Sequence, residues 1–93
     1  MPRYLVERHF PDGLHIPLDA HGAHICGAVV ERNLAEDVTW VHSYVTPDNL
    51  TTYCVYDGPD PEAIRRAAAG NDLPVERITE VRVLDPYFYG GVD

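Results

Sequence analysis

The stretch that decides the fold runs from residue 38 to residue 61 and reads VTWVHSYVTPDNLTTYCVYDGPDP. It contains two runs rich in β-branched and aromatic residues, 38–46 and 51–57, separated by the turn sequence Pro47-Asp48-Asn49. Runs of this kind bounded by turn residues are typical of consecutive strands. Because the turn is short, the pattern predicts an antiparallel hairpin.

The same signals place a strand and a helix on each side of this hairpin. Downstream, Asp60 suits the N-cap of a helix, Pro61 its first helical position and Gly70 its C-terminal cap. The other expected elements are strands at 3–10 and 77–84 and a helix from the cap residue Asp19 to about residue 33. The order β-α-β-β-α-β predicts a ferredoxin-like α+β fold, a four-stranded antiparallel sheet with two helices on one face.

Length and charge narrow the class of protein. The 93 residues allow one core, so residues 1–93 are expected to form a single domain whose aromatic tail, from about residue 86, packs on the domain or on a dimer partner. A net charge of -8 argues against a nucleic-acid partner, because phosphates would be repelled. No apolar run approaches the ~20 residues of a membrane helix. Charges near the start interrupt any export signal, so we expect no membrane association and a cytoplasmic protein. Cys26 and Cys54 have mostly apolar neighbours and are expected to be buried, reduced thiols.

Alternation along the strands assigns side chains to the two faces of the sheet. The set expected beneath the helices is Tyr4, Val6, Val41, Val45, Tyr53, Val55, Val81 and Val83, with Ser43 as a polar exception. The set expected on the open face is Leu5, Glu7, His9, Trp40, His42, Tyr44, Cys54, Tyr56, Glu80, Arg82 and Leu84. This face is too aromatic to stay in solvent, which predicts a homodimer with facing sheets, a dimeric α+β barrel. Acids, imidazoles, phenols and a thiol would then converge in a ligand cavity.

Structural roles compete with the ligand interpretation. His42 is equally well explained as a hydrogen-bonded structural histidine beside Tyr44. Glu7 and its neighbours Glu80 and Arg82 suit a cross-strand ion-pair network. Tyr44 and Tyr56 are residues that commonly pack in interfaces.

Several segments together resemble a known family. They are PRYLVER (2–8), WVHSYVT (40–46), YCVYDGP (53–59), EAIR (62–65) and LPVERITEV (73–81). The chain resembles a family of small bacterial ferredoxin-like proteins that includes a nickel-binding member. The resemblance implies a ferredoxin-like fold, a homodimer and bound nickel. The resemblance implies that His42 is a metal ligand. Four further residues match positions of the family's motifs, but the resemblance does not indicate which of them are ligands: Glu7, Tyr44, Cys54 and Tyr56.

Three further histidines lie outside that resemblance, so a metal role for them rests on chemistry alone. His21 and His24 are three residues apart on an expected helix and share a side. With Asp19 they would suit a surface divalent ion, or they form an ordinary solvated helix start. His9 closes the first strand on the face assigned to His42. The paired Cys-x-x-Cys spacing of structural zinc is absent from the sequence.

These observations leave three functions open. The leading one is a nickel-binding or other divalent-metal protein acting in storage, buffering or sensing. The alternative is a small barrel enzyme of the isomerase or monooxygenase type, with His42 as general base and Tyr44 or Tyr56 as acid. The third is a module whose aromatic face serves dimerisation alone.

Overall fold

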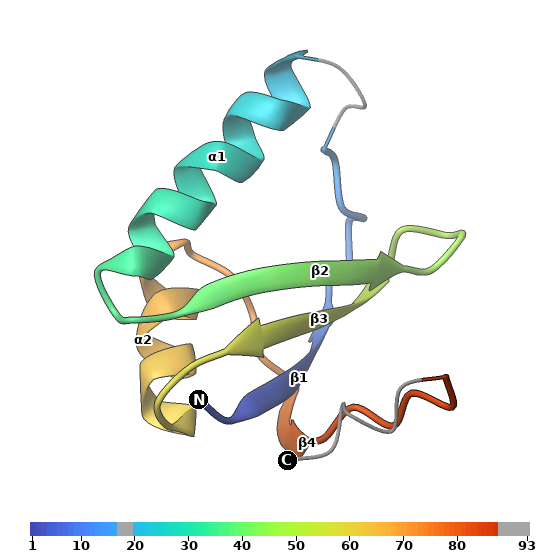
Figure 1. The fold of residues 1–93 in the computed structure, drawn as a ribbon. Helices are drawn as coiled ribbons and strands as arrows, with labels where there is room; N and C mark the ends of the chain where they lie inside the picture. Colours follow the sequence, from blue (N-terminus) through green and yellow to red (C-terminus); the bar gives the residue numbers. More distant parts are fainter. Residues whose placement is uncertain (17–19, 88–93) are drawn as a thin grey trace.

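The structure is a computed structural model that describes residues 1–16 and 20–87. Its elements are β1 (Arg3–His9), α1 (Ala20–Leu34), β2 (Thr39–Val45), β3 (Thr51–Asp57), α2 (Pro61–Gly70) and β4 (Arg77–Val81). The strands form one antiparallel sheet in the order β2-β3-β1-β4 (Figure 1). The ferredoxin-like α+β prediction is therefore confirmed, although the last strand ends three residues earlier than expected.

Helix α2 forms where its caps predict it. The Asp60 carboxylate accepts a hydrogen bond of 2.8 Å from the backbone N–H of Ala63, and Pro61 occupies the first turn. The C-terminal cap is Asn71 and not Gly70, because the Asn71 N–H reaches the carbonyls at the end of the helix. The helix buries a stripe at helical spacing that consists of Ala63, Ile64, Ala67 and Ala68.

Helix α1 is held less firmly than α2. Its buried residues are Gly22 and Asn33, whereas Val30 and Leu34 are exposed. The N-terminal part of the helix extends beyond the sheet in Figure 1. At the other end, Asn33 Oδ1 accepts a hydrogen bond of 2.9 Å from Asn71 Nδ2 after α2. The C-terminal end of α1 is thus attached in part by a polar contact, while Ile25, Cys26 and Val29 along the helix are half-buried. Its predicted cap, Asp19, lies outside the described residues.

The core lies between the sheet and α2. It contains Tyr4, Val6, Val38, Cys54, Tyr56, Ala63, Ile64 and Ala67, with Trp40, Val75 and Ile78 packed against it. The faces predicted for β1 are confirmed, since Tyr4 and Val6 are buried there. For β3 the prediction is wrong: Cys54 and Tyr56 lie beneath the helices, whereas Tyr53 and Val55 share the open face with Leu5 and Glu7.

An irregularity in β2 accounts for a further correction. The register shifts between Trp40 and His42, so Trp40 lies opposite Tyr56 on the core side while His42 lies opposite Val55 on the open face. An extra residue in a strand breaks the alternation, so residues two apart point to opposite faces. The open-face prediction is wrong for Trp40 and confirmed for His42 and Tyr44. Of the set expected beneath the helices, Ser43 and Val45 do lie on that side, opposite the buried Cys54 and Thr52. Val41 and Val45 are nevertheless exposed, because β2 is an edge strand.

In β4 the predicted faces are reversed. Ile78 pairs with Val6 on the core side, which places Glu80 opposite Tyr4 on that side and Val81 opposite Arg3 on the open side. The next residues, Arg82, Val83 and Leu84, follow the end of the strand and are exposed.

The remaining predictions concern the thiols, the tail and the membrane. Cys26 and Cys54 are both free, as expected, with Cys54 buried and Cys26 half-buried. Most of the aromatic tail, residues 88–93, lies outside the described residues, and Tyr87 is exposed. Neither helix in the described part of the chain has the length and hydropathy to span a bilayer.

Candidate functional site

The open face of the sheet carries an aromatic and polar patch built by strand register. Tyr44 of β2 lies opposite Tyr53 of β3, which lies opposite Glu7 of β1. His42 occupies the neighbouring row on β2, opposite Val55. Adjacent strands are about 4.8 Å apart, so these side chains form one continuous surface. We call His42, Tyr44, Tyr53 and Glu7 the open-face patch.

The imidazole of His42 is exposed and oriented by its neighbour. Its ring centroid lies 5.2 Å from that of Tyr44, with an angle of 84° between the rings. This edge-to-face arrangement is a favourable aromatic geometry. Within residues 1–16 and 20–87, no hydrogen bond or ion pair engages the side chain of His42. Both ring nitrogens are therefore available to an external ligand, and the hydrogen-bonded structural role is not the one observed.

Asp57, an acidic residue on the same face, already forms an ion pair. Asp57 accepts two hydrogen bonds from the Arg3 guanidinium, of 2.8 and 3.0 Å. These hydrogen bonds hold the pKa of Asp57 below its usual range, against an opposing effect of desolvation. Asp57 is thus a structural partner of Arg3. Glu7, by contrast, lies opposite Arg77 in the register and remains the carboxylate of the patch.

Two predicted site residues lie on the other side of the sheet. Cys54 is buried, and its thiol donates to the Thr52 hydroxyl at 3.5 Å. The Tyr56 hydroxyl accepts a hydrogen bond of 3.1 Å from Arg8 Nη2. Burial raises the pKa of Tyr56, although the Arg8 charge acts in the opposite direction. Neither side chain shares a face with His42.

The other predicted histidines are dispersed. His9 is exposed at the end of β1. The hydrogen bond from the Thr46 hydroxyl is the main cause that lowers the pKa of Asp48, and the charge of His9 is a smaller one. His21 and His24 are exposed on α1. In the part of the chain that the structure describes, no three His, Cys, Asp or Glu residues are grouped to hold a metal ion.

Sequence reasoning missed two residues. Tyr53 belongs to the open-face patch, but its place depends on the pairing of β3 with β1. Arg8 is buried beneath the helices at 2% exposure. Its signal was present in the sequence, because Arg8 continues the alternation of Tyr4 and Val6.

The fold and its open-face patch define a small ferredoxin-like domain in which the helices cover one face of the sheet and leave the other open (Figure 1). Residues 4–81 match the family described as nickel responsive protein SCO4226-like, and the chain belongs to that family. Among solved structures, the chain resembles SCO4226 from Streptomyces coelicolor A3(2) with a TM-score of 0.69. The two share 20% sequence identity over 89% of this chain and 99% of the other. That likeness supports the fold. The search of curated proteins found no match.

Proposed function

We propose that this protein binds nickel, or a similar divalent transition metal, on the open face of its sheet and acts in metal storage, buffering or sensing. Membership in a nickel responsive family supports the choice of metal. The observation that carries the proposal is the exposed, unengaged imidazole of His42 beside Tyr44. Imidazole is a ligand that suits nickel, and carboxylate oxygens such as those of Glu7 complete octahedral sites.

A second copy of the chain completes the site in this proposal. One chain offers His42 and Glu7 from strands two apart in the sheet order, and its described residues group no three ligands. Two open faces turned together would contribute a second imidazole and a second carboxylate. Tyr44 and Tyr53, exposed by 62% and 36%, supply apolar area for that contact. A cytoplasmic setting is part of the proposal, since it would keep Cys26 and Cys54 reduced.

The barrel-enzyme alternative is weakened by the placement of Tyr56. Its phenol lies among the core residues on the helix side, so it cannot donate a proton to a substrate held by His42. Tyr44 would remain as the acid of such an enzyme. No observation favours that reaction over metal binding.

The test uses untagged protein that is purified without metal-affinity chromatography. Its metal content is measured by mass spectrometry, and Ni²⁺, Zn²⁺, Cu²⁺ and Co²⁺ are titrated calorimetrically. His42→Ala is expected to weaken nickel binding by about 100-fold or more, because even outer-shell partners contribute about 10–100-fold. His15→Ala, which removes an exposed imidazole from the loop after β1, is the matched control and should bind as wild type does.

Two further readouts separate the alternatives. Binding should weaken below about pH 6, because protonated imidazoles do not ligate metals. Full affinity in His42→Ala together with loss in His24→Ala would move the site to α1 and contradict the proposal. Sedimentation of the same samples tests the homodimer, and a monomer with full nickel affinity would contradict the shared site.

A further inference from the structure

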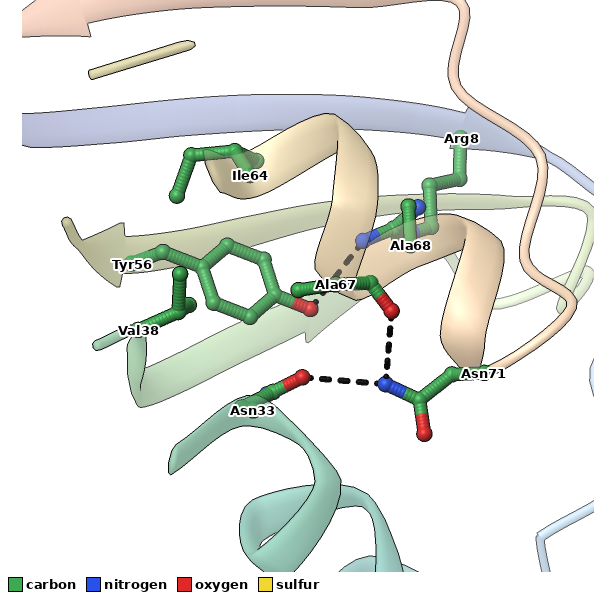
Figure 2. A pocket seen from close by; sticks show the side chains of 8 residues that line it. All are labelled: Arg8, Asn33, Val38, Tyr56, Ile64, Ala67, Ala68 and Asn71. Carbon is green, nitrogen blue, oxygen red and sulfur yellow. Dashed lines mark hydrogen bonds between the residues drawn. The ribbon is translucent and has the colours of Figure 1, made fainter. Parts of the chain in front are cut away.

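Strand β2 places Trp40 and His42 on opposite faces of the sheet. Its pairing with β3 shifts between them, so that Trp40 lies opposite Tyr56 and His42 lies opposite Val55. Figure 2 shows the Tyr56 ring among core side chains on the helix side of the sheet. Side chains two residues apart share a face in a regular strand, so this separation of the indole from the imidazole requires the bulge.

A hydrogen bond on the helix side spans the bulge. Trp40 Nε1 donates to Ser43 Oγ at 2.8 Å. Ser43 lies opposite the buried Cys54, so it points to the same side of the sheet as Trp40. In a regular strand, side chains three residues apart point to opposite faces and cannot form such a bond. The bond is therefore specific to the bulged strand and stabilises it against the regular one.

A regular β2 could not keep both placements. If Trp40 stayed against the core, His42 and Tyr44 would turn towards the helices. If the pairing beside the hairpin turn stayed, where the Thr46 N–H donates to the Thr51 carbonyl at 3.0 Å, Trp40 would turn to the open face beside His42. Either change would alter the surface around the imidazole.

We propose that Trp40 and Ser43 are positioning residues for His42, because their hydrogen bond stabilises the bulge that presents the imidazole on the open face. The role of His42 as a metal ligand rests on the proposed function, whereas the effect of the bond on the strand does not. Since the bond favours the register that exposes His42, a ligand on His42 must in turn favour the bond. Metal binding on the open face is thereby coupled to the packing of Trp40 on the helix side.

Three substitutions in β2 isolate the hydroxyl of Ser43. Ser43→Thr keeps the acceptor, whereas Ser43→Val has nearly the same shape and lacks it. Val45→Ala is the matched control, because Val45 lies on the same side of the strand, is exposed by 47% and is outside the bulge. Loss of one neutral hydrogen bond shifts an equilibrium by about 2–10-fold, so Ser43→Val should weaken nickel binding by that factor. Ser43→Thr and Val45→Ala should bind nickel as wild type does.

Nuclear Overhauser effects in the metal-free protein read the strand register directly. The bulged strand gives both the Trp40–Tyr56 and the His42–Val55 cross-strand contacts, and a regular strand keeps only one of them. One of the two contacts should weaken in Ser43→Val, and both should stay as in wild type in Ser43→Thr and Val45→Ala. Retention of both contacts at full strength in Ser43→Val overturns the proposal, as does an equal loss in Ser43→Thr.

The coupling is read from the indole N–H signal, which is unique because Trp40 is the single tryptophan of the chain. Diamagnetic Zn²⁺ should slow the hydrogen exchange of this N–H in wild type and leave it unchanged in His42→Ala. A zinc-bound wild type with unchanged exchange would overturn the coupling.

A double-mutant cycle shows whether the two positioning residues act through one bond. Trp40→Phe removes the donor, and its combination with Ser43→Val should weaken nickel binding no further than the stronger single substitution. Effects that multiply would overturn the assignment. A wild type that binds no nickel would contradict the proposed function alone, and the cross-strand contacts of the metal-free variants would still decide whether the bond stabilises the bulge.

Discussion

Replacing Tyr56 with Phe separates a core role from a site role for this residue. The substitution removes the hydroxyl that accepts from Arg8 Nη2 at 3.1 Å and leaves the aromatic ring, which is 4% exposed, in place. The guanidinium then keeps the Pro74 carbonyl as its remaining acceptor among the described residues. Hydrogen bonds to charged groups contribute about 1.5–3 kcal/mol. Because 3.1 Å is a long bond, we expect a loss near the lower end, about 1.5–2 kcal/mol.

The assay is urea and thermal unfolding at one protein concentration, since any dimer would make the midpoint depend on concentration. For a domain of this size, the expected loss lowers the thermal midpoint by roughly 6–16 °C. Tyr53→Phe is the matched control. That hydroxyl lies on the open face at a residue exposed by 36%, so the change should stay within about 0.5 kcal/mol.

Nickel affinity measured on the same two variants completes the test. Tyr56→Phe should bind nickel as wild type does, because its hydroxyl faces away from His42. A variant of unchanged stability, or a stable variant with weakened nickel binding, would refute the reasoning. Either result would return Tyr56 to the open face where sequence alternation had placed it.

Two further predictions concern acidic side chains with structural roles. Asp60→Ala removes the cap that accepts from the N–H of Ala63 and should cost about 1 kcal/mol in urea unfolding, whereas Asp60→Asn should retain most of the stability. Asp57→Asn should cost about 0.5–1 kcal/mol at pH 7, a figure reduced for partial exposure. Arg3 depresses the folded pKa of Asp57, so this contribution is present above the unfolded value and is lost as the pH falls through the folded one. Unfolding curves of wild type and variant should therefore converge in acid, and a constant difference would rule out the ion pair as its source.

The order of elements could be predicted because its signals are local. Turn residues separate the strands, and Asp60 with Pro61 begins α2 through contacts within four residues. The position of His42 on the open face was also predicted, but two errors cancelled. The prediction placed Tyr56 on the open face and treated β2 as a regular strand. In fact Trp40 lies opposite Tyr56 on the core side, and the bulge after Trp40 returns His42 and Tyr44 to the open side.

The faces of β3 and β4 could not be predicted in the same way. In β3 both alternating sets contain a tyrosine and another apolar residue, Tyr53 with Val55 and Tyr56 with Cys54. Alternation then shows which residues share a face but not which face meets the helices. The hydrogen-bonded register with β1 decides it, because Cys54 lies opposite the buried Val6.

The sequence by itself determined the ferredoxin-like element order, the start of α2 and the choice of His42 as a candidate ligand. Those features depend on short-range geometry and on the chemistry of single side chains. The tertiary structure alone decided that Cys54 and Tyr56 belong to the core and that Tyr53 joins the open-face patch. These placements depend on strand pairing, a bulge and helix docking, which join residues far apart in the chain and leave no signal within any one segment.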